Sequence, residues 1–424
     1  MTHIGILCPA ATGHLNPMTA LGRELITRGH QVTVFGLVDA RTKTLAAGLN
    51  FCGIGESLFP VGSTAMRLTE LGKLSGIAAF KYTINQMLNE SYAVLTEAPS
   101  LLKRGGVEIL LVDQAISEGG TIAEFLDIPF ISVCNALLLN REDDVPPIVT
   151  PWNYNSAWWA RLRNNTGYAL ISILTRSLRE VIEEYRRKWK LPQYNFYPND
   201  FYSKLAQLSQ QPELFEFPRK LLPNYFHFTG PYHNAASRNA VPFPYENLTG
   251  QPLIYASLGT VQNRLMKIFS CIAEACNGLD VQLVISLGGG YKLSSLPNLP
   301  GKPLVVEYAP QLELLKKATL TITHAGMNTT LESLSNGVPM VAIPITNDQP
   351  GVAARIAWTE TGEVVPLKSL SVPKLRNAIT KVLAVNSYKK NALRLQEAIE
   401  NSGGLSRAAD IIEQVISTKE PVLR

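Results

Sequence analysis

The residues best suited to chemistry cluster within positions 308–353. An apolar run ends at His324, Gly326 permits a tight turn, and Asn328 and Thr329 then open a predicted helix. The first amide groups of a helix have no partner inside it and lie at the positive end of its dipole. The turn therefore predicts a site for an anion such as a phosphate, with the His324 imidazole as a further donor.

Three side chains near this turn suit a sugar. Glu332 lies one turn inside the predicted helix, where its carboxylate can accept hydrogen bonds from a ribose diol. Asp348 and Gln349 combine an acceptor with an amide that both donates and accepts. Each residue alone has a structural explanation, because polar side chains commonly cap helices or face solvent in loops. Their order and spacing together favour a nucleotide-sugar site.

A candidate general base lies near the N-terminus. His14 falls between a predicted strand and a predicted helix, and an imidazole with an ordinary pKa of about 6.5 can remove a proton at neutral pH. Asp113 follows the predicted strand 109–112, where its carboxylate can orient that imidazole. The pair predicts activation of an acceptor hydroxyl. Helix-start hydrogen bonding for His14 and helix capping for Asp113 are the structural alternatives.

The elements that must position these residues alternate between strands and helices. Segments 4–8, 15–28 and 31–35 form a β-α-β unit, and such units build parallel sheets with ligands at the carboxyl ends of the strands. A second series begins near residue 253. A chain of 424 residues also exceeds the usual size of a single core. We therefore expect an α/β protein with two doubly wound, parallel-sheet domains that face each other across a cleft.

The composition along the chain indicates the domain boundaries and excludes some classes of partner. We expect a first domain at 1–234 with His14 and Asp113, a Pro-, Asn-, Ala- and Ser-rich linker at 235–250, a second domain at 251–402 with the nucleotide-sugar motifs, and a terminal helix at 403–424 that packs back on the first domain. The formal charge is +5, and no Lys/Arg run is interleaved with aromatics, so nucleic acid is not expected. We recognise no targeting or membrane-spanning segment, which predicts a cytoplasmic protein, and we expect a monomer.

Metal and cofactor chemistry is not expected. The five cysteines form no CxxC pair, and neither half of the chain contains the GxGxxG fingerprint of nicotinamide dehydrogenases. Asp143 and Asp144 are adjacent rather than spaced as Asp-x-Asp. We predict a metal-independent reaction with a nucleotide sugar as co-substrate and no cofactor.

These motifs resemble the donor signature of the family 1 UDP-glycosyltransferases, whose GT-B fold has two facing Rossmann-like domains. The resemblance covers almost the whole chain. It is carried by Tyr-Ala-Pro-Gln at 308–311, by the segment 324–332, and by Asp-Gln-Pro-Gly-Val-Ala-Ala-Arg at 348–355. The last segment and Asn-Arg-Glu at 140–142 are similar to the branch of bacterial zeaxanthin glucosyltransferases and macrolide glycosyltransferases.

The resemblance implies an inverting transfer of a hexose, glucose by family habit, from a UDP-sugar to a hydroxyl of an apolar acceptor. A xanthophyll, a polyphenol such as a flavonoid, and a macrolide are candidate acceptors. His14 would be the base and Asp113 its partner, while Tyr308 would stack on the uracil. Plant members carry Trp at the positions of Tyr308 and Met327. The implied donor-binding set is Ser257, Gly259, Thr260, Ser286, Tyr308, Gln311, His324, Gly326, Asn328, Thr329, Glu332, Asp348 and Gln349.

The acceptor side is less defined by the sequence. Asn135 follows a predicted strand and is a candidate contact for sugar or acceptor, as is Trp152. The aromatic stretch 152–159 precedes a basic stretch at 161–190, which fits either peripheral membrane contact or the wall of a hydrophobic tunnel. Alternative functions are a lipid-linked GlcNAc transferase or UDP-GlcNAc epimerase of the same fold, and a non-catalytic UDP-sugar-binding module.

Overall fold

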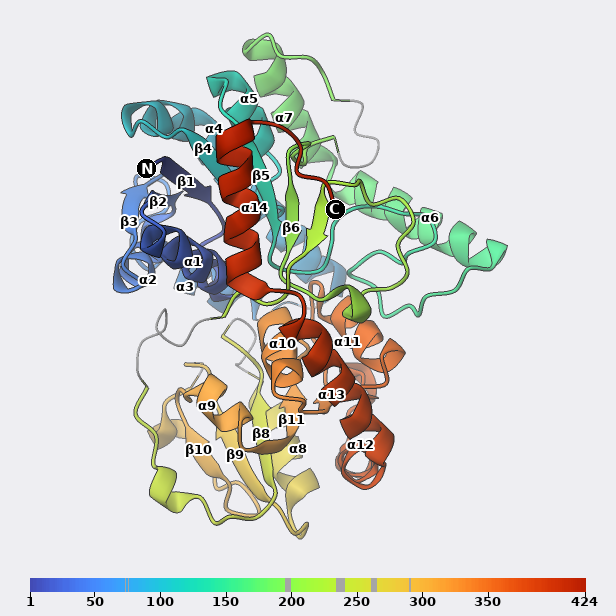
Figure 1. Cartoon of the computed structure of the whole chain (residues 1–424). Coiled ribbons are helices and arrows are strands. Elements are labelled where there is room, and N and C mark those ends of the chain that lie inside the picture. The colour runs from blue at the N-terminus through green and yellow to red at the C-terminus, as the bar shows by residue number, and fades with distance from the viewer. Residues whose placement is uncertain (73, 75, 195–199, 234–240, 261–264, 290) are drawn as a thin grey trace.

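The computed structural model describes residues 1–72, 74, 76–194, 200–233, 241–260, 265–289 and 291–424. These residues form two α/β units, one above the other in the view of Figure 1. Each unit has a single sheet in which every described strand pair is parallel. Two doubly wound domains were predicted, and the prediction is confirmed.

The N-terminal sheet has seven strands in the order β3-β2-β1-β4-β5-β6-β7. Its strands are buried over most of their length, as expected of a parallel sheet covered on both faces. The strand bounds are β1 His3–Leu7, β2 Gln31–Gly36, β3 Asn50–Gly53, β4 Ile109–Asp113, β5 Phe130–Cys134, β6 Gln207–Ser209 and β7 Phe226–Phe228.

Helices cover both faces of this sheet. Side chains of α1 and α14 share one core with the strands, while those of α4, α5 and α7 share the core on the opposite face. The helix bounds are α1 Thr12–Thr27, α2 Arg41–Ala46, α3 Ser63–Leu71, α4 Gly76–Arg104, α5 Gly119–Leu126, α6 Trp158–Leu174 and α7 Arg176–Lys188.

The C-terminal sheet has six strands in the order β10-β9-β8-β11-β12-β13. Helices α8 and α12 pack on one face, and α10, α11 and α13 pack on the other. The strands are β8 Leu253–Ser257, β9 Gln282–Ser286, β10 Leu304–Val306, β11 Ala318–Thr323, β12 Met340–Ala342 and β13 Gly362–Val364. The helices are α8 Met266–Cys276, α9 Gln311–Leu315, α10 Met327–Ser335, α11 Gln349–Trp358, α12 Val372–Ala384 and α13 Asn386–Glu400.

The last helix, α14 (Gly404–Thr418), returns to the first domain (Figure 1). Its apolar residues, among them Ile412 and Val415, belong to the same core as α1 and the N-terminal sheet. Arg28 at the end of α1 donates to Asp410 at 2.6 Å and to Glu413 at 2.7 Å. The chain therefore crosses between the domains twice. The first crossing spans the predicted linker, of which residues 235–240 lie outside the described part of the chain.

Candidate active site

A cavity of about 450 Å³ lies between the two domains and is lined by both. It gathers segments that are far apart in the sequence because parallel strands present their carboxyl ends at one edge of each sheet. His14 and Asn135 line it from the N-terminal domain. All thirteen residues of the predicted donor set line it from the C-terminal domain.

The predicted base and its partner are in direct contact. His14 lies in the first turn of α1, and Asp113 is the last residue of β4 in the adjacent position of the sheet. The ring Nδ1 is 2.8 Å from Asp113 Oδ2. Because Nδ1–H donates to the carboxylate, Nε2 is left as the nitrogen that can accept a proton. Asp113 itself is 1% exposed and lies behind His14 rather than in the cavity wall.

Two further hydrogen bonds fix the carboxylate. Asn135 Nδ2 donates to Asp113 Oδ2 at 2.7 Å, and the Ala115 amide donates to Asp113 Oδ1 at 2.8 Å. Asn135, which directly follows β5, thus contacts the carboxylate that also contacts His14. Its Oδ1 is buried and forms no hydrogen bond to the described residues.

The surroundings change the basicity of His14. Loss of solvent lowers its pKa, but the charge and hydrogen bond of Asp113, with a further contribution from Asp348, raise the pKa above its ordinary value. The imidazolium is therefore the better stabilised form, as expected for a group that must take up a proton. The pKa of Asp348 is also raised, in this case because of its burial, although the charge of His14 opposes that shift.

The turn between β11 and α10 holds His324 in a narrow slot. A Cβ on Gly326 would lie 2.5 Å from the ring, and a Cβ on Gly259 would lie 2.7 Å from it. Both positions must therefore lack a side chain while the ring stays in place. Burial lowers the pKa of His324 to about 4, against a raising contribution from the Ser257 backbone. The ring is neutral at physiological pH and can offer a hydrogen bond but no positive charge.

A polar network occupies the wall between β8, α9 and α10. Gln311 Nε2 donates to Glu332 Oε2 at 2.6 Å and to Thr329 Oγ1 at 3.3 Å. Tyr255 OH donates to Gln311 Oε1 at 3.0 Å. Tyr255 was not among the predicted residues, although it lines the same cavity. These contacts hold the Glu332 carboxylate at the cavity wall.

Asp348 and Gln349 lie at the start of α11. The side-chain oxygen Oε1 of Gln349 accepts hydrogen bonds from the backbone amides of Ile345 and Thr346 at 2.8 and 3.0 Å. This side chain therefore stabilises the turn that precedes α11. Asn347 beside them has a left-handed backbone, with φ of 55°. The turn presents both predicted sugar-binding residues to the cavity.

The Asn328 side chain joins the two domains. Its Nδ2 donates to the carbonyl of Gly13 at 2.9 Å, and its Oδ1 accepts from Gln210 Nε2 at 3.0 Å. Because Gly13 precedes His14, this contact links the start of α10 to the turn that carries His14. Both polar atoms of the Asn328 side chain therefore already have partners in the protein. The backbone amides at the start of α10 are the groups left for contact with a phosphate.

Trp152 does not line the cavity. Its ring lies 4.9 Å from the Arg163 guanidinium, and a Cβ on Gly167 would lie 3.0 Å from it, so it packs against α6. The N-terminal domain instead contributes residues of α3 and α4 to the cavity wall, and neither helix was predicted from the sequence. Their cavity-lining residues are Thr64, Arg67, Leu68, Leu71, Tyr82, Thr83, Gln86, Met87 and Glu90.

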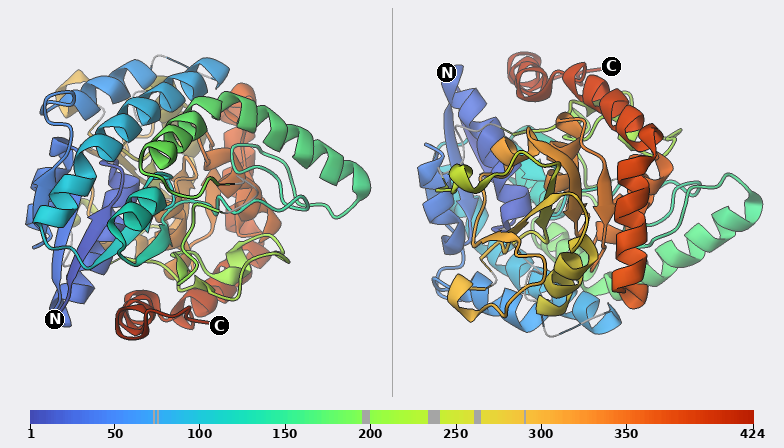
Figure 2. Two further views of the ribbon diagram at one scale, coloured as in Figure 1. Left: turned by 90° about the horizontal axis from the view of Figure 1, so that it is seen from above. Right: turned by 90° about the horizontal axis from the view of Figure 1, so that it is seen from below.

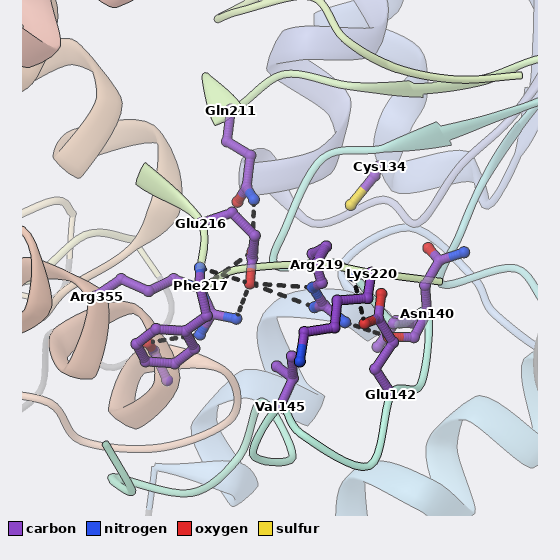
Figure 3. Close-up of polar contacts among 12 residues, drawn as sticks. Cys134, Asn140, Glu142, Val145, Gln211, Glu216, Phe217, Arg219, Lys220 and Arg355 are labelled. Carbon is purple, nitrogen blue, oxygen red and sulfur yellow. Dashed lines mark hydrogen bonds and ion pairs between the residues drawn. The ribbon is translucent and has the colours of Figure 1, made fainter. Parts of the chain in front are cut away.

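A second buried contact between the domains lies behind α11 (Figure 3). Arg355 of α11 donates to both carboxylate oxygens of Glu216, which belongs to the N-terminal domain, with Nε at 3.1 Å from Oε2. Arg219 donates to the same carboxylate at 3.3 Å, and Gln211 donates to it at 2.6 Å. The network ties the helix that begins with the predicted sugar-binding residues to the opposite domain.

No group of three or more His, Cys, Asp and Glu is placed to hold a metal ion within the described ranges. Among the helices in the part of the chain that the structure describes, none is long and apolar enough to cross a membrane.

Residues 83–415 match the family of the UDP-glucoronosyl and UDP-glucosyl transferases. The chain belongs to this family. The transferase is 33% identical to a zeaxanthin glucosyltransferase of Pantoea ananas, over 100% of this chain and 98% of the relative. It is 30% identical to a zeaxanthin glucosyltransferase of Pseudescherichia vulneris, over 100% of both chains.

The fold of the transferase is also shared with solved structures. The glycosyltransferase of kitacinnamycin superposes with a TM-score of 0.76 at 20% identity, covering 97% of this chain and 98% of the other. The predicted family and GT-B fold are thereby confirmed. The transferase moves a glycosyl group from a nucleotide sugar.

Proposed function

We propose that this transferase moves glucose from UDP-glucose to a hydroxyl of a large apolar acceptor, with inversion at the anomeric carbon. The observation that carries the proposal is the His14–Asp113 contact in a cavity that also collects every predicted donor residue. A module that only bound the nucleotide would have no use for an oriented base.

In the proposed reaction, Nε2 of His14 takes the proton of the acceptor hydroxyl as its oxygen attacks the anomeric carbon. The bond from that carbon to the diphosphate oxygen breaks, and UDP leaves with the electron pair. Asp113 stays ionised and stabilises the imidazolium. The raised pKa of His14 supports this role, since a stronger base at a fixed position favours proton removal.

Charge develops on the diphosphate as UDP leaves. The backbone amides at the start of α10 and the neutral ring of His324 are preorganised donors beside this position. Helix-start donors need no metal ion to bind a phosphate, which supports a metal-independent reaction. The Gln311–Glu332 pair is proposed to bind the ribose, and Tyr308, about half exposed at the cavity wall, to stack on the uracil.

The acceptor is proposed to be a hydroxylated carotenoid or a compound of similar size and apolarity. The relatives named as zeaxanthin glucosyltransferases support this class. Leu68, Leu71 and Met87 give α3 and α4 an apolar contribution to the wall, although the Arg67–Glu90 ion pair also lies there. Apolar burial contributes about 25 cal/mol per Å², so a large lipophile needs few polar contacts.

The test is the release of UDP from UDP-glucose with a panel of alcohols of increasing apolar area. We expect turnover with zeaxanthin and with several polyphenols and macrolides, and little with small sugars. A preference for small polar acceptors would contradict the acceptor class. Retention of the anomeric configuration in the product would contradict the single displacement with His14 as base.

A further inference from the structure

Helix α6 presents an unpartnered apolar face to solvent. Trp158, Leu162, Thr166, Ala169 and Ile173 are all exposed, and their spacing of four, four, three and four residues places them on one stripe of the helix. Trp158 is 76% exposed, Leu162 62% and Ile173 70%. Only Thr166 is polar in this stripe. Soluble proteins rarely expose a continuous apolar surface of this kind without a function for it.

Two more exposed apolar side chains widen this face. Trp159 and Leu170 lie next to the stripe and are 47% and 57% exposed. Figures 1 and 2 show α6 extending away from both domains, so neither sheet covers it. None of the residues in the face lines the cavity between the domains. Binding of an acceptor in that cavity would therefore not account for the exposed apolar face of α6.

The charge of the protein is concentrated on this helix and the next one. Residues 158–190 contain eight Lys or Arg and three Glu, a net charge of +5, which equals the formal charge of the entire chain. The remaining residues thus carry 31 basic and 31 acidic groups. Helix α6 itself has two arginines and no acidic residue. Two of these cations pair with carboxylates outside the segment, because Arg161 contacts Asp144 and the buried Arg186 contacts Glu124. The segment keeps an excess of three positive charges beyond these two pairs, and such an excess attracts an anionic surface.

The arginines lie close to the apolar face. Arg163 stacks against Trp152 and Trp159, at 4.9 and 5.7 Å from their ring centroids. Arg179 donates to the Ser172 carbonyl at 2.7 Å, which places a cation at the far end of α6. Aromatic and aliphatic side chains beside arginines are the pattern of helices that lie in the interface of a lipid bilayer.

We propose that α6 docks on the surface of an anionic lipid bilayer, with the face formed by Trp158, Trp159, Leu162, Ala169, Leu170 and Ile173 inserted among the lipids. A second copy of the chain is a poorer occupant, because a symmetric contact would bring two segments with an excess of positive charge together. Under the proposed function, docking brings the transferase to the phase in which apolar alcohols concentrate.

The test is flotation of the intact protein with vesicles, which requires no acceptor. Vesicles of equal parts phosphatidylcholine and phosphatidylglycerol are compared with vesicles of phosphatidylcholine alone. We expect binding to the anionic vesicles at least about tenfold stronger than to the neutral ones, because each basic side chain near the surface adds attraction. High salt should weaken this binding, since salt screens exposed charges.

The variant Leu162→Ser with Ile173→Ser removes two aliphatic side chains from the face. The matched control, Leu45→Ser with Leu393→Ser, removes two exposed leucines from α2 and α13. We expect the first variant to lose most of its vesicle binding and the control to keep it, while both retain the UDP affinity of the wild type. Affinity for UDP reports on folding and does not depend on α6.

Three results would overturn the proposal. One is equal or absent binding of the wild-type protein to the two kinds of vesicle. Another is equal binding by the α6 variant and its control. The third is a wild-type dimer, detected by light scattering, that dissociates in the α6 variant, since the face would then be a contact between copies of the chain.

Discussion

Replacing Glu216 by Gln tests how strongly the two domains are held together. The substitution preserves the size of the side chain and removes its charge. In the native structure this carboxylate is 1% exposed and faces two arginines, Arg355 at 1% and Arg219 at 4% exposure. The variant leaves both guanidinium groups buried beside a neutral amide. The amide NH2 group replaces one carboxylate oxygen and cannot accept the hydrogen bonds that this oxygen accepted.

The magnitude follows from this burial. Breaking a buried ion pair by neutralising one partner costs about 3–5 kcal/mol, because the remaining charge stays desolvated. Because two cations share this carboxylate, we expect the free energy of unfolding to fall by an amount within that range. Exposed ion pairs typically contribute less. Burial alone would raise the pKa of Glu216. The charges of Arg355 and Arg219 outweigh that effect, and the pKa lies below its ordinary value.

The pH dependence of stability follows from that shift. A carboxyl group whose pKa is lowered by folding stabilises the native state above its unfolded pKa, and this contribution is lost as the pH falls through the lowered folded value. The wild-type protein should therefore lose stability in acid below about pH 4.5. In that pH range the stability of the Glu216→Gln variant should fall less than the stability of the wild type, because glutamine does not take up a proton there.

The assay is urea unfolding followed by tryptophan fluorescence, with Glu213→Gln as the matched control. Glu213 is an exposed glutamate three residues earlier in the same loop. Because α11 begins at Gln349, we also expect a higher KM for the UDP-sugar in the Glu216 variant. If the free energy of unfolding fell by less than about 1 kcal/mol, as for an exposed ion pair, Glu216 would not act as a buried link between the domains.

Four further predictions concern the chemistry. His14→Ala should abolish transfer and leave UDP binding nearly intact by calorimetry; substantial residual turnover would remove His14 as the base. Because the pKa of His14 is raised, activity should rise with pH through a midpoint above the ordinary histidine range, and Asp113→Asn should lower both kcat and that midpoint; an unmoved midpoint would contradict the pairing. Glu332→Ala should weaken UDP binding by about 1–3 kcal/mol, the cost of leaving buried polar groups unpaired; unchanged affinity would place ribose recognition elsewhere. EDTA should leave turnover unchanged, and a strict Mg²⁺ requirement would contradict the proposed metal independence.

The donor half of the site could be predicted from sequence because it is built from local motifs. A strand end, a glycine turn and a helix start follow one another within residues 321–332, and their chemistry does not depend on distant parts of the chain. The same holds for the start of α11 with Asp348 and Gln349. The alternation of apolar runs and helices also determined the two parallel sheets, since each strand must be buried on both faces.

The acceptor half depended on packing that the sequence pattern does not display. Helices α3 and α4 have mixed apolar and polar residues, and only the tertiary structure shows that Leu68, Leu71 and Met87 reach the cavity. Trp152 looked suited to an acceptor, but its ring is occupied by Arg163. An aromatic side chain in a loop can pack in many directions, and its sequence neighbours do not select one.

The contacts between the domains were decided by the tertiary structure alone. The sequence identified Asn328 by its place at a helix start, yet its side chain reaches Gly13 and Gln210 across the cleft. Glu216 and Arg355 are 139 residues apart, and the sequence does not show that they pair with each other. The sequence determined the local turns that we propose to bind the nucleotide sugar. Which distant groups hold those turns against the base depended on how two folded domains meet, because a contact between domains is set by surface shape and charge rather than by spacing along the chain.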